Sequence, residues 1–132
     1  MKKLLLICLL FLAGCSPKQD IKDYTVVYKN KDVYPGTSSK KMSDALFDSN
    51  IQYSDSKNKI ETITLFNKTY TLKNKIKVGT QYKKVKNTYS SPYSNTYKNG
   101  KGSLIYHYDD QKIELKFIFK DSKVNVINLS RY

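Results

Sequence analysis

The chain of 132 residues carries 24 lysines and arginines against 11 aspartates and glutamates, a formal net charge of +13. This length allows one small domain or two very small halves. The two cysteines, Cys8 and Cys15, both lie close to the amino terminus. The rest of the chain therefore cannot form a disulfide or a thiolate metal site.

The first residues have the order of a secretory signal. Two lysines precede an apolar run over residues 4–12, and small residues follow it before a cleavage point. The run is too short to span a bilayer. Residues 12–15, of sequence LAGC, resemble the lipobox of bacterial lipoproteins, which implies cleavage before Cys15 and lipid on its sulfur. We expect residues 1–14 to be a cleaved signal peptide.

The polar residues 15–23 lack periodicity and are expected to form a lipidated tether. They precede a small α+β domain over 24–132, with possible halves over 24–72 and 73–132. This organisation places the protein at the cell membrane or the outer membrane, lipid-anchored and facing outside the cytoplasm. The sequence does not say which of these two membranes holds the anchor.

Without residues 1–14, 22 basic and 11 acidic residues remain, a net charge of +11. Export argues against nucleic acid as a partner, and the lysines are scattered along the chain. Two interpretations of the charge are compatible with the sequence. One is that the lysines reflect the composition of an AT-rich genome, and the other is that they attract anionic headgroups or acidic wall polymers.

In the first half, residues 24–28 are β-branched and aromatic and predict a short strand. Residues 30–36 predict a turn, and a helix is expected over 38–48. The apolar stripe of that helix comprises Met42, Ala45 and Leu46.

Residues 48–58 predict a polar loop. The alternating residues 60–66 predict a strand that forms a hairpin with residues 69–72. A second helix is expected over 80–90, because Pro92 prevents its continuation. Its apolar stripe comprises Tyr82, Val85 and Tyr89.

The final third predicts a three-stranded antiparallel meander over 104–108, 113–119 and 124–129. In the last strand Val124 and Val126 are in phase with each other, whereas Ile127 and Leu129 are not, which indicates a bulge. The fold class is therefore α+β, with two short helices packed on antiparallel sheet.

Two segments repeat at an offset of 43 residues. Residues 35–46 and 78–89 share Gly, Thr, Lys and Lys at equivalent positions, and both precede predicted β structure. Glycine permits the turn, threonine caps the helix, and the helix lays its stripe on the sheet. A tandem α-β-β repeat is the simplest explanation.

The second copy and the meander, over residues 76–130, resemble the SmpA/OmlA (BamE) lipoproteins and the β-lactamase inhibitory protein. The shared pattern is a Gly-Thr entry to a helix, a Tyr-containing exit before proline, and a meander. Residues 90–91 are both serine where that family has glycine. The resemblance implies a small unit that holds other proteins, and it transfers no contact residue.

The sequence offers no catalytic arrangement. His107 is the single histidine and is expected at a sheet surface, while Asp109 and Asp110 belong to a turn. Glu61 and Glu114 alternate with apolar strand residues and are expected to face solvent. We therefore expect no enzyme activity, no metal site and no cofactor.

Twelve tyrosines are an unusual number for this length. Tyr93 and Tyr97 lie in a Ser- and Asn-rich loop of the kind that suits protein contacts, and they are the candidate partner-binding residues. The leading hypothesis is a lipid-anchored, non-enzymatic envelope protein that binds or scaffolds another envelope protein or a wall component. The alternative is an inhibitor or immunity-type lipoprotein that blocks an exported or incoming enzyme.

Overall fold

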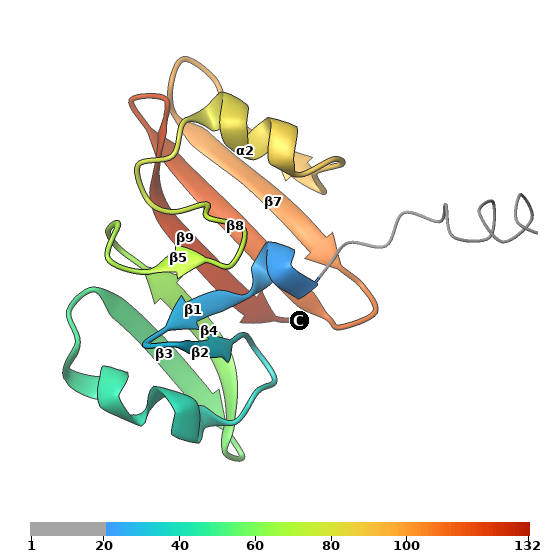
Figure 1. Ribbon diagram of the computed structural model, residues 1–132. Coiled ribbons are helices and arrows are strands. Elements are labelled where there is room, and N and C mark those ends of the chain that lie inside the picture. The colour runs from blue at the N-terminus through green and yellow to red at the C-terminus, as the bar shows by residue number, and fades with distance from the viewer. Residues whose placement is uncertain (1–20) are drawn as a thin grey trace, which may run out of the picture.

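The computed structural model describes residues 21–132 (Figure 1). The predicted signal peptide, the lipid site at Cys15 and most of the predicted tether fall on residues 1–20, outside the described part. Within residues 21–132, no helix is both long and apolar enough to cross a membrane. The first described element is a short 3-10 helix, η1 (Ile21–Tyr24), which overlaps the end of the predicted tether.

Two antiparallel sheets and two longer helical segments form an α+β fold, the class predicted from the sequence. The small sheet has the order β2-β1-β5 and contains β1 (Val26–Tyr28), β2 (Lys31–Val33) and β5 (Thr71–Leu72). The large sheet has the order β3-β4-β9-β8-β7-β6. Its strands are β3 (Ile51–Ser56), β4 (Lys59–Leu65), β6 (Ser94–Asn95), β7 (Gly102–Tyr108), β8 (Ile113–Lys120) and β9 (Lys123–Arg131). The helices are η2 (Ser39–Phe47), a 3-10 helix, and α2 (Tyr82–Thr88).

One face of the large sheet is covered by the small sheet and α2 (Figure 1). Alternate residues of the long strands point into this interface, as a period of two requires. In β8, for example, Leu115 and Phe117 have no exposed surface. The small sheet contributes Val26 and Tyr28 to the same hydrophobic cluster, and α2 contributes Val85. Removal of these side chains from water is the main term that stabilises the fold.

The predicted meander is confirmed as β7, β8 and β9, which pair consecutively. The predicted bulge is also present in β9. Ile118 pairs with Val126 whereas Phe119 pairs with Val124, so Asn125 is left over. The extra residue explains why Val124 and Ile127 both face the core although they are three positions apart.

Three predictions for the first half are wrong. Residues 48–58 contain β3, an edge strand paired with β4, and the predicted turn over 30–36 contains β2. The hairpin of residues 60–66 with 69–72 does not form, because β4 pairs with β3 and β9 while β5 pairs with β1. Strands of both halves of the chain pair within the large sheet, so closeness in sequence does not indicate which strands pair.

The predicted helix over 38–48 is present, but as the 3-10 helix η2. Its amino-terminal cap is Ser38, whose hydroxyl accepts a hydrogen bond from the N–H of Lys40 at 3.3 Å. A 3-10 helix has three residues per turn, so Met42 and Ala45 share one buried face. The assignment of Leu46 to this stripe is wrong, because it lies a third of a turn further round and is 68% exposed.

The two Gly-Thr segments of the sequence repeat form the same turn. Gly36 and Gly79 have φ of +102° and +97°, a region that glycine adopts without strain. The N–H of Gly36 donates to the carbonyl of Ile60 at 2.8 Å, and Ile60 donates back to the residue after the glycine at 2.9 Å. Gly79 and Val124 form the equivalent pair, with both hydrogen bonds at 2.8 Å. Each turn thus connects the start of a helix to the second strand of a hairpin, β4 in one case and β9 in the other.

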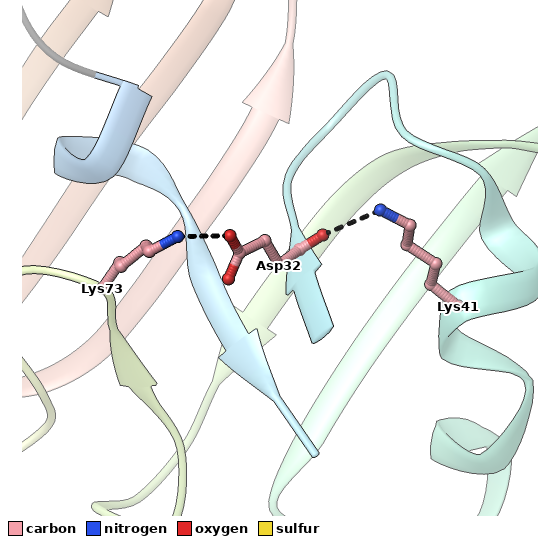
Figure 2. A network of polar contacts seen from close by, with 3 residues as sticks. All are labelled: Asp32, Lys41 and Lys73. Carbon is pink, nitrogen blue, oxygen red and sulfur yellow. Dashed lines mark hydrogen bonds and ion pairs between the residues drawn. The ribbon is translucent and has the colours of Figure 1, made fainter. Parts of the chain in front are cut away.

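A small polar network joins β2, η2 and the residue that follows β5 (Figure 2). The side chain of Lys73 lies 2.5 Å from the carboxylate of Asp32 on β2, and Lys41 on η2 donates to the backbone carbonyl of Asp32 at 3.2 Å. The side chains of Lys73 and Asp32 are 41% and 44% exposed. Water screens such a pair, so its contribution to stability is below about 1 kcal/mol.

Candidate partner-binding surface

The second face of the large sheet has no covering layer of described residues. Both helical segments and the small sheet lie on the other side (Figure 1). We call this surface the open face. It is formed by the partly exposed residues that alternate with the core positions: Thr62, Thr64, Ile105, His107, Glu114, Lys116, Ile118, Val126, Asn128 and Ser130. A broad, mixed polar and aliphatic surface of this kind suits contact with another macromolecule.

Hydrogen bonds between side chains organise one half of the open face. The amide of Asn128 on β9 donates to the hydroxyl of Thr64 on β4 at 2.8 Å. Ser54 on β3 and Thr62 on β4 share a hydrogen bond of 2.6 Å. These cross-strand pairs hold the polar groups in fixed positions, which lowers the entropy that a partner must remove on binding.

Aromatic rings gather on the other half of the open face. The ring of Tyr93 stacks on His107 with centroids 3.7 Å apart, and the ring of Tyr132 lies at 4.6 Å from the same imidazole, tilted by 30°. Tyr93 remains 70% exposed and Tyr132 50%. The predicted contact residue Tyr93 is therefore a supported aromatic platform at the surface, the type of residue that anchors many interfaces.

Charged groups surround these rings. The Nε2 atom of His107 lies 3.1 Å from the Oε1 atom of Glu114. Glu114 was predicted to face solvent, but its carboxylate is only partly exposed and pairs with the imidazole. The hydroxyl of Tyr132 donates to the carboxylate of Asp109, and this hydrogen bond raises the pKa of Tyr132 to about 12. The ammonium group of Lys112 lies 5.9 Å from the centre of the Tyr132 ring.

The geometry around His107 does not suit nucleophilic catalysis. In the strand register Glu114 lies between His107 on β7 and Ser130 on β9. A serine nucleophile needs the imidazole next to the hydroxyl, with the carboxylate behind it as an orienting group. The order across this sheet is the reverse. The His107–Glu114 pair therefore positions the ring under Tyr93 and does not serve as a base for Ser130.

Tyr97, the second predicted contact residue, lies on the covered side of the sheet. Its ring stacks on Tyr82 of α2 with centroids 3.6 Å apart and an interplanar angle of 11°. It also meets the edge of the buried Phe119 at 5.5 Å. Tyr97 thus helps to hold α2 on the sheet. The structure does not bring Tyr93 and Tyr97 together on one surface.

Sequence reasoning missed three exposed apolar residues in the first half. Leu46 is 68% exposed, Phe47 94% and Phe66 44%. Leu46 and Phe66 line a shallow hollow of about 280 Å³ that also includes Asp48. The hydroxyl of Tyr70 donates to Asp48, and this bond lowers the pKa of the carboxyl and raises that of Tyr70 to about 12. A 3-10 period applied to residues 42–47 would have indicated which apolar side chains stay outside.

Within residues 21–132, no group of three or more His, Cys, Asp or Glu side chains is arranged so that it could hold a metal ion. Glu61, the other carboxylate predicted to face solvent, lies 3.6 Å from the guanidinium of Arg131 and is partly exposed.

Comparisons of the chain with protein-family models, with curated proteins and with solved structures find no match. The resemblance to the SmpA/OmlA lipoproteins therefore remains a prediction.

Proposed function

We propose that this chain is a lipid-anchored protein of the bacterial cell envelope that binds another envelope protein or a wall component and catalyses no reaction. The observation that carries the proposal is the open face, where Tyr93 stands 70% exposed on His107. Three pairs of its polar side chains are already hydrogen-bonded to each other, and its aromatic platform already stacks on His107, so binding requires little reorganisation. A preorganised surface without a nucleophile–base pair favours recognition over catalysis.

The anchor part of the proposal depends on residues 12–15 and is tested by Cys15→Ser. This variant should move the protein from the membrane to the soluble fraction or leave an unprocessed precursor. Labelled palmitate should enter the wild type and not the variant. Incorporation of palmitate into Cys15→Ser would show that another residue carries the lipid.

The contact surface is tested by photo-cross-linking in cells. A benzophenone amino acid replaces Tyr93 in one strain and Phe47 in a control strain. Phe47 is a suitable control because it is even more exposed, at 94%, and lies on η2, on the covered side of the sheet. We expect a discrete covalent adduct from position 93 and none from position 47. Equal adducts from both positions, or none from position 93, would contradict the proposal.

The inhibitor or immunity role is distinguished by the protein found in the adduct. A scaffolding role predicts a structural envelope component. An inhibitory role predicts an exported or incoming enzyme whose activity falls when the purified chain is added. Substitution of Tyr93 by alanine should restore that activity, because it removes the aromatic platform without touching the core.

We also propose that the two halves are tandem α-β-β repeats. The matching hydrogen bonds of Gly36 with Ile60 and of Gly79 with Val124 support this interpretation. In both halves a helix begins at the turn and a hairpin follows it along the chain. Such a tandem unit is what the resemblance to the SmpA/OmlA lipoproteins and the β-lactamase inhibitory protein implies.

A further inference from the structure

Positive charge gathers at one end of the molecule, which we call the basic pole. It consists of three segments: α2 with the turn before it (residues 77–86), the loop 98–101, and the β8–β9 turn (residues 120–123). Together they carry eight lysines and a single carboxylate, Asp121. All eight lysines are exposed. The scattered lysines of the sequence are thus concentrated by the fold.

Backbone contacts bring these segments together. The N–H of Ser122 donates to the carbonyl of Gly100 at 2.9 Å, and the N–H of Tyr82 donates to the carbonyl of Ser122 at 2.9 Å. The side chains of Lys83, Tyr97 and Ser122 line one shared hollow. Figure 1 shows α2 and the β8–β9 turn at the same end of the large sheet. The basic pole is therefore a single surface.

The charge of the basic pole is not neutralised within the described chain. None of its eight lysines forms an ion pair with any residue of 21–132. Adjacent unpaired charges of one sign create a potential that extends over the surface and attracts counter-ions of high charge. A ligand with repeated negative groups can contact several of these lysines at once, because they belong to three separate segments.

We infer that the basic pole binds a phosphate-bearing anionic polymer. The charge density and the absence of internal counter-ions define the chemistry of the ligand. Because the eight lysines come from three separate segments, a chain with repeated phosphates can contact several of them at once, which favours a polymer over a single small anion. Recognition is electrostatic, so the affinity depends on charge density and falls steeply as salt rises.

The test uses residues 16–132, which contain every described element, with circular dichroism to confirm folding. Long-chain inorganic polyphosphate is the polymer probe, and vesicles of phosphatidylglycerol and phosphatidylcholine are the membrane probe. The pole variant combines Lys83→Glu, Lys98→Glu and Lys123→Glu. The control variant combines Lys40→Glu, Lys59→Glu and Lys68→Glu, which are exposed lysines of the first half. Both variants have the same net charge.

We expect polyphosphate binding by the wild type, a loss of more than tenfold in affinity for the pole variant, and a change below threefold for the control. Three outcomes would overturn the inference: no binding by the wild type, an equal loss in both variants, or tighter binding to the vesicles than to polyphosphate. These measurements do not involve Cys15. A failure here therefore leaves the anchor untouched, and a failure of the Cys15→Ser fractionation leaves polymer binding untouched.

Discussion

The hydroxyl of Tyr89 donates a hydrogen bond to the backbone carbonyl of Asp23 at 2.5 Å, across 66 positions of sequence. The amide of Asn74 donates to the same hydroxyl at 2.9 Å. Tyr89 is only 2% exposed. One phenol thus connects the end of α2, the segment after β5, and the turn η1 where the described chain begins. Burial raises the pKa of Tyr89, so the hydroxyl remains a donor throughout the physiological range.

The first prediction concerns this junction. Tyr89→Phe keeps the ring and removes the hydroxyl, so the packing is preserved while the Asn74 amide loses its acceptor. We expect the free energy of unfolding to fall by about 1–2 kcal/mol, the usual cost of a lost buried hydrogen bond. Urea denaturation followed by circular dichroism measures the change.

Tyr93→Phe is the matched control, because Tyr93 is 70% exposed. Its unfolding midpoint should equal that of the wild type within error. If Tyr89→Phe and Tyr93→Phe have the same midpoint, the hydroxyl of Tyr89 does not join these segments in solution.

The second prediction concerns Tyr106, whose buried hydroxyl has no hydrogen-bond partner among the described residues. Removal of an unpaired polar group from the core is neutral or stabilising. Tyr106→Phe should therefore leave the free energy of unfolding at pH 7 unchanged or raise it slightly. A loss as large as that of Tyr89→Phe would show that the hydroxyl of Tyr106 has a partner after all.

Tyr106 also makes stability depend on alkaline pH. Burial raises the pKa of Tyr106 from its usual 10 to about 12. The folded state therefore favours the neutral phenol, and the unfolded chain releases the proton first. This contribution is complete below pH 10 and is lost as the pH rises from 10 through 12. Urea denaturation at pH 7 and pH 11 should show a smaller loss for Tyr106→Phe than for the wild type.

The core residues of the second half could be predicted from the sequence, because apolar residues recur there with the two-residue period of a strand. Buried and partly exposed residues alternate along β8 from Ile113 to Phe119. The change of phase between Val126 and Ile127 predicted a bulge in the last strand, and the extra residue is Asn125. The register of a strand that is buried on one face and exposed on the other is fixed, because a shift by one residue would turn its apolar side chains toward solvent.

The first half was harder because its strands are short or lie at an edge. Ile51 is the one fully buried residue of β3, so the rest of that strand has the composition of a loop. The turn between β3 and β4 uses Lys57 and Asn58 at positive φ without the glycine that usually marks such a hairpin. Likewise, the open face could not be predicted, since Tyr93 meets His107 only after β6 has paired with β7.

The third prediction tests the period of η2. Met42 is fully buried whereas Leu46, four residues later, is 68% exposed. Met42→Ala should lower the free energy of unfolding by about 2–5 kcal/mol, because it leaves a cavity in the core. Leu46→Ala should change it by less than about 0.5 kcal/mol. Similar losses in both variants would mean that the segment forms an α-helix in solution, with both side chains on the buried face.

The fourth prediction compares the two Gly-Thr turns. A Cβ atom at Gly36 or Gly79 meets no atom within 4 Å, so alanine there introduces backbone strain and no clash. The cost of a left-handed conformation for alanine is about 1–2 kcal/mol. Because both turns make the same hydrogen bonds, we expect Gly36→Ala and Gly79→Ala to lower the free energy of unfolding by similar amounts. Ser43→Ala, at an exposed position of η2, is the control and should have little effect.

The double variant sharpens this comparison. The turns at Gly36 and Gly79 attach to different strands, β4 through Ile60 and β9 through Val124, and they share no hydrogen-bond partner. Their effects on unfolding should therefore add. A large loss at one glycine with none at the other would show that only one turn closes as described, and it would remove the structural support for a tandem repeat. Equal and additive losses would mean that each helix is held to its own hairpin by an equivalent glycine turn with the same pair of backbone hydrogen bonds.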